Sequence, residues 1–95
     1  MVMESVFDQR HTAPIRRLVD GSRRWRVLVE TWRDSDAFHG RLLFRRDESD
    51  RLAPERPQPS LETAPLLHGR SREDVLGLAH DVTEERLRRV LHSLG

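Results

Sequence analysis

The 95-residue chain contains no cysteine, lysine, asparagine or tyrosine, and a single isoleucine, Ile15. Without cysteine it can form neither disulfides nor thiolate metal sites. No segment approaches the roughly 18 apolar residues that a membrane-spanning helix needs. The first residues lack both the basic leader and the apolar core of a signal peptide. These absences predict a cytoplasmic protein that does not interact with a membrane.

The missing lysine changes how the arginines are interpreted. All 17 basic residues are arginine. Lysine, asparagine, tyrosine and isoleucine have AT-rich codons, so a GC-rich bacterial genome explains the four shortages together. The guanidinium fork suits phosphates, but the formal net charge is only +1. The arginine content alone therefore does not indicate a nucleic-acid partner.

The chain has little apolar material for a core. Apolar residues make up 36% of it and charged residues 35%, against about 45–50% and 25% in typical globular proteins. A chain of this length suffices for one domain and buries only about 60–65% of the surface of its unfolded form. A small core under a charged surface follows, and oligomerisation is one common way to stabilise such a chain.

Two segments predict a β-hairpin. Residues 24–32 are rich in β-branched and aromatic side chains with period-two alternation, and residues 37–45 follow after a polar turn. We place the turn at Asp34 and Ser35, which collects most large apolar groups on one face. The cross-strand pairs are then Trp25 with Phe44, Val27 with Leu42, Val29 with Gly40 and Thr31 with Phe38. Gly40 leaves room on that face for a close neighbour.

An edge strand is predicted upstream, over residues 15–19, because an Asp-Gly-Ser turn at residues 20–22 joins it to the hairpin. A three-residue loop would place Ile15 and Val19 on the apolar face, whereas a two-residue loop would not. We favour three residues. Pro14 suits an edge strand or the start of a strand.

The C-terminal part has the pattern of two capped helices. Ser71 and Thr83 are the expected N-caps, each followed by acids in the first turn. The second helix carries an apolar stripe, which comprises Leu87, Val90, Leu91 and Leu94. Ahead of the helices, residues 65–68 are expected to form a short strand or to pin the chain to the core. The proline-rich, acidic residues 47–60 read as a solvated connector.

The sequence therefore predicts an α+β fold, in which a short antiparallel β-meander of two to three strands packs against a C-terminal two-helix hairpin. The boundaries divide a single domain into an N-terminal tail (1–13), the meander (14–46), the connector (47–60) and the helical hairpin (61–95).

Two stretches resemble known families. Residues 82–91 resemble the opening of a recognition helix in helix-turn-helix proteins, but the turn before them lacks the usual glycine, and Glu84 and Glu85 would repel DNA. Residues 71–76, which follow the hairpin, are similar to the capped helix in the β-β-α fold of HicB-family antitoxins. The proline-rich connector is foreign to that fold. Neither resemblance rests on a diagnostic motif.

Catalytic and metal-binding patterns are absent from the sequence. The five histidines are scattered, and none forms the i, i+4 pair of a helical metal site. There is no G-x-S-x-G elbow and no glycine-rich phosphate loop. The acids at residues 47–50 lie in a solvated run where little would raise a pKa. We expect a protein that is not an enzyme and uses no metal or cofactor.

The second face of the hairpin carries the leading functional hypothesis. One helical layer covers only one side of a sheet, which leaves apolar groups among arginines without a cover. Tryptophan and arginine are typical anchors of interfaces. We therefore predict a non-catalytic protein-interaction module, either a homo-oligomer such as a homodimer or an accessory subunit of an assembly. The predicted interaction residues are Leu28, Trp32, Leu43, Arg26 and Arg41. The alternative cover is the N-terminal segment containing Val2, Val6 and Phe7.

A nucleic-acid-binding regulatory protein is the second hypothesis. Basic groups around an aromatic ring bind single strands by charge and stacking. The residues that would carry this activity are Arg24, Arg26, Arg41, Arg45 and Trp32. The register assigns Trp25, Phe38 and Phe44 to the core instead, which favours the protein-interaction hypothesis.

Overall fold

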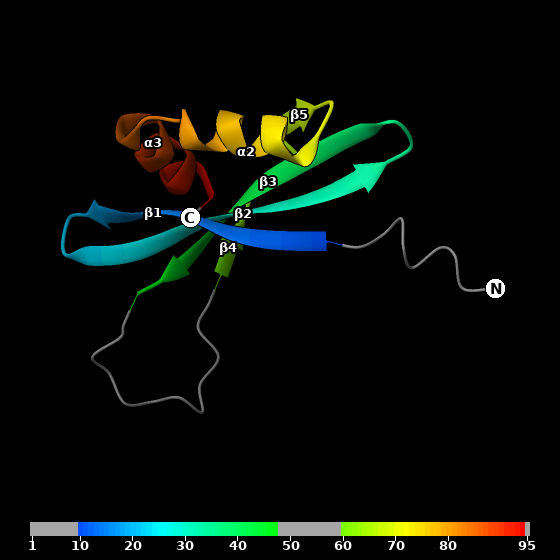
Figure 1. Cartoon of the computed structure of the whole chain (residues 1–95). Coiled ribbons are helices and arrows are strands. Elements are labelled where there is room, and N and C mark those ends of the chain that lie inside the picture. The colour runs from blue at the N-terminus through cyan, green and yellow to red at the C-terminus, as the bar shows by residue number, and fades with distance from the viewer. Residues whose placement is uncertain (1–9, 48–59, 95) are drawn as a thin grey trace.

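A computed structural model describes residues 10–47 and 60–94. Its elements are β1 (Arg10–Asp20), β2 (Arg23–Asp34), β3 (Ala37–Arg46), β4 (Ser60–Glu62), β5 (Leu67–Gly69), α2 (Arg72–His80) and α3 (Glu84–Leu94). The strands form one antiparallel sheet in the order β1-β2-β3-β4, and β5 also pairs with β3. Both helices lie on the same side of this sheet (Figure 1). The predicted α+β class is confirmed, with five strands in place of two or three.

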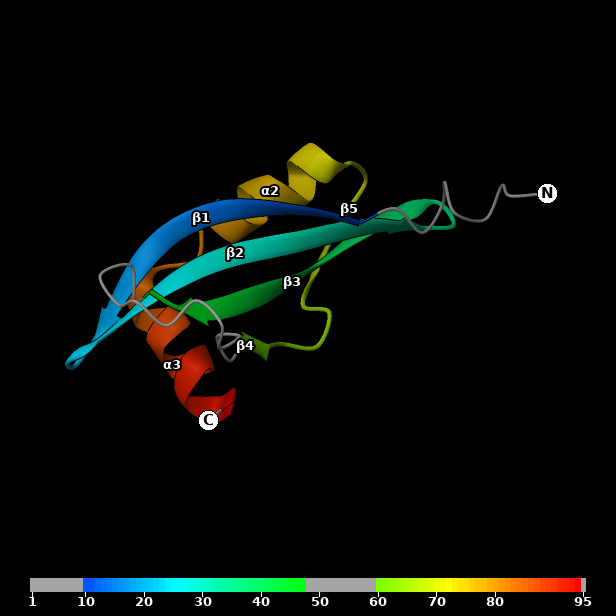
Figure 2. The ribbon, with the colours of Figure 1, turned by 90° about the horizontal axis from the view of Figure 1, so that it is seen from below.

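Most of the predicted connector, residues 48–59, lies outside the described residues, as do Val2, Val6 and Phe7. The side of the sheet that faces α2 and α3 is called the inner face below, and the opposite side the outer face. Figure 2 looks onto the outer face, with the helices behind the strands.

The β2–β3 hairpin turns one residue later than predicted. Asp34 pairs with Ala37, so the loop is Ser35 and Asp36, and Val27 lies opposite Phe44. The predicted pairs are therefore wrong by two residues. An even shift keeps each side chain on its predicted face.

The physical reason for this register lies on the outer face of the hairpin. Here Leu28 lies opposite Leu43 and Glu30 opposite Arg41. The predicted register would have set Leu28 against the charged Arg41. Pairs of apolar groups and pairs of opposite charges stabilise a sheet.

The loop between β1 and β2 has two residues, Gly21 and Ser22, and the predicted three-residue loop is wrong. Gly21 has a φ of 64°, a conformation that glycine adopts without steric cost. Consequently Leu18 lies opposite Trp25 and is buried, whereas Val19 is 54% exposed. A bulge between Pro14 and Arg16 still allows Ile15 to pack against the core.

The core lies between the inner face and the two helices. From the sheet, Val27, Val29 and Phe44 are fully buried. From the helices, Val75, Ala79, Leu87 and Leu91 are buried against them. The predicted stripe on α3 thus faces the core. Amphipathic burial of this kind supplies most of a short helix's stability.

Both predicted N-caps are present. The Ser71 hydroxyl accepts a hydrogen bond from the Asp74 backbone N–H at 3.1 Å. The Thr83 hydroxyl accepts one from the Arg86 N–H at 3.2 Å. Each bond satisfies a donor that the first helical turn leaves without a partner.

Polar contacts tie α3 to β1, although the two are far apart in the sequence. The Arg88 Nε donates to the Val19 carbonyl at 3.0 Å, and the His92 Nε2 lies 2.9 Å from a carboxylate oxygen of Asp20. The segment between β4 and β5 is held to β3 by Thr63, whose hydroxyl accepts from the Leu42 N–H at 3.0 Å.

Neither helix of the described part is long and apolar enough to cross a membrane.

Candidate interaction surface

The outer face combines a tryptophan, two leucines and many charged groups. These side chains share the face because every second residue of a strand points to the same side of the sheet. The cross-strand pairs place these side chains side by side. Trp32 lies opposite His39, Leu28 opposite Leu43, and Arg26 opposite Arg45. In the part of the chain that the structure describes, no helix packs on this face.

Trp32 is the aromatic centre of the face. The Arg10 guanidinium lies 4.5 Å from the centroid of its ring, within cation–π range, and the Arg41 guanidinium lies at 6.0 Å. The His39 ring stacks beside it, with the centroids 6.0 Å apart and an interplanar angle of 29°. The indole is partly buried. These neighbours restrict its orientation before any partner arrives.

Glu30 joins the arginines around this ring. Its Oε1 atom accepts from the Arg41 Nε at 2.7 Å and from Arg10 at 3.4 Å. Arg41 also contacts Glu62 on β4 at 3.0 Å. One carboxylate oxygen therefore organises groups from β1 and β3, and the network fixes the guanidinium planes.

Next to Trp32, a histidine pair joins β3 to β5. The Nδ1 atoms of His39 and His68 lie 2.8 Å apart, so one imidazole donates the hydrogen bond and the other accepts it. The rings meet edge to face. The His39 Nε2 lies 3.9 Å from Asp34. These contacts extend the polar part of the surface to the tip of the hairpin.

The other end of the outer face is basic. Arg17 and Arg26 both approach the carboxylate of Asp47, at 3.8 and 4.0 Å. Arg24 and Arg45 are exposed and make no ion pair with any residue in the ranges 10–47 and 60–94. Of the described arginines on this face, these two are therefore candidates to meet an anion.

The structure brings the predicted interaction residues onto one face, but their exposure differs. Leu28 and Leu43 are only 8% and 5% exposed, so they form the floor of the surface. Trp32 and Arg41 are partly exposed and Arg26 is exposed.

Sequence reasoning missed Arg10, Glu30, His39 and His68 as members of this surface. Arg10 was assigned to the tail, although an edge strand extended to residue 10 brings it opposite Trp32. Alternation on β2 and β3 could have placed Glu30 and His39.

Within the described ranges, no three histidine or acidic side chains are placed to hold a metal ion. Comparison of the chain with protein-family models, with curated proteins and with solved structures finds no match in any of the three.

Proposed function

We propose that the protein is a non-catalytic interaction module whose outer face binds a second copy of the same chain. The observation that carries this proposal is the position of Trp32. It lies on a face that neither α2 nor α3 covers, and it is held between Arg10 and His39. Tryptophan with arginine at its side is typical of the centre of an interface. An anchor held in place in advance loses less entropy on binding.

The outer face fits this role better than the edge of the sheet does. β1 is an edge strand of 11 residues, but Pro14 has no backbone N–H to donate and the bulge beside it breaks the register. Both features oppose the addition of a further strand. Association through the face avoids this obstacle.

The charges on the outer face support association with an identical partner. Its described arginines are Arg10, Arg17, Arg24, Arg26, Arg41 and Arg45, and its described acids are Glu30, Asp34, Asp47 and Glu62. Arg24 and Arg45 lie at one end of the strands and Asp34, with its side chain 71% exposed, at the other. A two-fold axis that runs the strands antiparallel would set Arg24 and Arg45 of each copy against Asp34 of its partner.

Sedimentation velocity across the micromolar range tests this proposal. We expect the full chain to form a dimer, and Trp32→Ala to weaken dimerisation by roughly tenfold or more, as for an interface anchor. Leu66→Ala is the matched control, because Leu66 is 48% exposed and lies away from the outer face. A chain that stays monomeric at every concentration, or a Trp32→Ala variant that dimerises normally, would refute the proposal.

Binding of single-stranded nucleic acid is the second candidate, favoured by Arg24 and Arg45, which are exposed and make no ion pair within residues 10–47 and 60–94. Fluorescence anisotropy with a labelled oligonucleotide should then show affinity that falls steeply with salt, because each phosphate contact releases a counterion. Replacing both arginines by glutamine should reduce that slope. A dimer with no affinity for the oligonucleotide at low salt would exclude this candidate and leave the first in place.

A further inference from the structure

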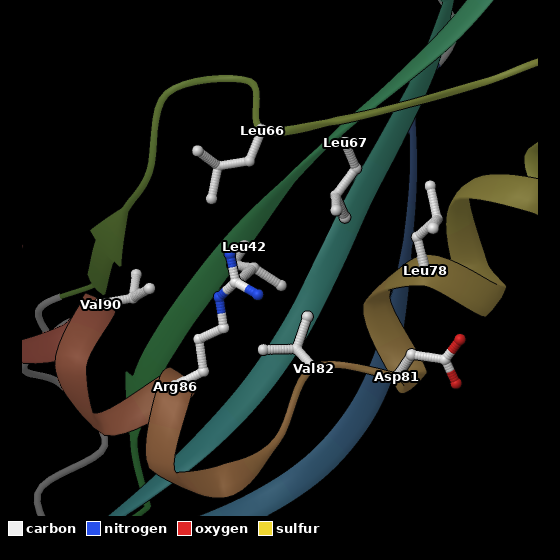
Figure 3. A pocket seen from close by; sticks show the side chains of 8 residues that line it. All are labelled: Leu42, Leu66, Leu67, Leu78, Asp81, Val82, Arg86 and Val90. Carbon is white, nitrogen blue, oxygen red and sulfur yellow. The ribbon is translucent and has the colours of Figure 1, made fainter.

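A pocket of about 460 Å³ opens between the helices and the inner face of the sheet. Figure 3 shows its lining, which comes from β3, from the β4–β5 segment and the start of β5, from the end of α2 and the turn after it, and from α3. The lining residues are Leu42, Leu66, Leu67, Leu78, Asp81, Val82, Arg86 and Val90. Pockets that bind small molecules have volumes of about 300–1,000 Å³.

The rim of this pocket exposes apolar groups that the fold does not cover. Leu66 is 48% and Leu78 45% exposed, and Val19 is the one other large hydrophobic side chain as exposed in residues 10–47 and 60–94. Two of these three therefore flank a single cavity. Exposed apolar groups gathered at a concave site mark a place where a ligand removes them from water.

Arg86 supplies the positive charge of the pocket. Its side chain extends from α3 into the space between the leucines, whereas the Asp81 carboxylate points away from it (Figure 3). The neighbouring arginines on the helix, Arg88 and Arg89, pair with the acids four residues earlier.

Arg86 has no such acid within its reach on the helix. The residues three and four positions away are Val82, Thr83, Arg89 and Val90. Among the described residues it makes no ion pair. Its charge is thus available at a pocket whose other lining residues, apart from Asp81, are apolar.

We propose that this pocket binds a small amphipathic carboxylate, with its apolar chain against the leucines and its carboxylate on Arg86. Guanidinium groups bind carboxylates through two parallel hydrogen bonds. Asp81 at the rim disfavours a ligand with a second negative charge. The site lies on the helical side of the sheet, opposite Trp32, so it is independent of the proposed dimer face.

The size of the pocket favours a small molecule over a protein segment. Helix-binding grooves accept anchors over several turns, whereas the lining here surrounds a single open pocket with one cation. Saturated aliphatic acids of medium length match that combination of shape and charge, and decanoate is the probe for the experiment.

Isothermal titration of the full chain with decanoate, kept below the concentration at which it forms micelles, tests the proposal. We expect saturable binding. Arg86→Gln should weaken it by roughly tenfold or more, the effect of losing a charge-assisted hydrogen bond. Decan-1-ol, which has the same chain without the charge, should bind the wild-type protein more weakly by a similar factor.

Arg89→Gln is the matched control, because its side chain is 73% exposed on the same helix and does not line the pocket. We expect it to bind decanoate as the wild-type protein does. Val82→Phe fills the pocket from the α2–α3 turn and should also reduce binding, and far-ultraviolet circular dichroism verifies that each variant is folded.

Three results would overturn the proposal. The first is the absence of saturable decanoate binding to the wild-type chain. The second is an equal loss in Arg86→Gln and Arg89→Gln, which would indicate general charge attraction. The third is binding of decan-1-ol as tight as that of decanoate. None of these results depends on the oligomeric state, so they leave the proposed dimerisation to its own test.

Discussion

Val75 on α2 packs directly onto the backbone of Gly40 on β3. A Cβ atom built at Gly40 would lie 2.5 Å from the Val75 Cγ1 atom, closer than real contacts allow. Val75 is fully buried. The absence of a side chain at this position of β3 therefore lets α2 approach the sheet closely.

Replacing Gly40 by alanine should destabilise the fold. The new methyl group would push α2 away from β3, and overpacking of a filled core typically costs about 1–3 kcal/mol. Urea denaturation followed by circular dichroism measures the change. Gly77→Ala is the control, because a Cβ there meets nothing within 4 Å. Alanine in place of glycine within a helix should raise the free energy of unfolding by about 0.5–1 kcal/mol. Equal effects of the two variants would contradict this account.

Exchanging glycine and serine at the first positions of the two hairpin loops should change the free energy of unfolding in opposite directions. Both loops begin with a positive φ, at Gly21 (64°) and at Ser35 (59°). This conformation costs an L-residue about 1–2 kcal/mol. Gly21→Ser should therefore lower the free energy of unfolding by about 1 kcal/mol, and Ser35→Gly should raise it by a smaller amount because glycine is more flexible when unfolded. Thermal unfolding of both variants checks the signs, and a shared sign would be incompatible with the turn geometry.

Loss of a core leucine on α3 should have a large effect. Leu87 is fully buried, and Leu87→Ala should cost about 2–5 kcal/mol through lost burial and the cavity it leaves. Leu78→Ala serves for comparison, since Leu78 is 45% exposed on α2 and its removal should cost far less. Chemical denaturation distinguishes them. A Leu87→Ala chain as stable as Leu78→Ala would mean that α3 does not pack on the sheet as described.

Removing the cap of α2 should weaken that helix. Ser71→Ala leaves the Asp74 N–H without its acceptor, which typically costs about 1 kcal/mol. Hydrogen exchange of the amides in the first turn of α2 should increase together with the loss of overall stability. Ser22→Ala, in the exposed β1–β2 loop, should change neither quantity. Unchanged exchange at Asp74 in the Ser71 variant would argue against the cap.

The elements of this fold could be predicted because their local signals agree with one another. Alternation predicted β2 and β3, and the hydroxyl residues before acidic turns predicted both helices. The predicted hairpin register was wrong by two residues. The choice between adjacent polar turns depends on cross-strand pairs, such as Glu30 with Arg41, and the prediction considered only which face each residue lies on. The predicted length of the β1–β2 loop was wrong because Leu18 and Val19 are both apolar, and only packing decides which of the two is buried.

The candidate surface was predictable in outline but not in detail. Alternation alone placed Trp32 with Leu28 and Leu43 on the face opposite the helices. It could not show that the leucines are nearly covered, nor that Arg10 reaches the indole, since alternation gives the face of a residue and neither its burial nor its contacts. The pocket around Arg86 joins residues from four elements, and no spacing in the sequence indicated it.

The contacts between α3 and β1 bear on how the chain folds as it is synthesised. The bonds from Arg88 to Val19 and from His92 to Asp20 span 69 and 72 residues, and contacts of long sequence separation form slowly. Until α3 leaves the ribosome, Leu18 and its neighbours on β1 have no helix to cover them. The nascent chain would therefore leave this part of its apolar sheet open to chaperones until α3 has emerged.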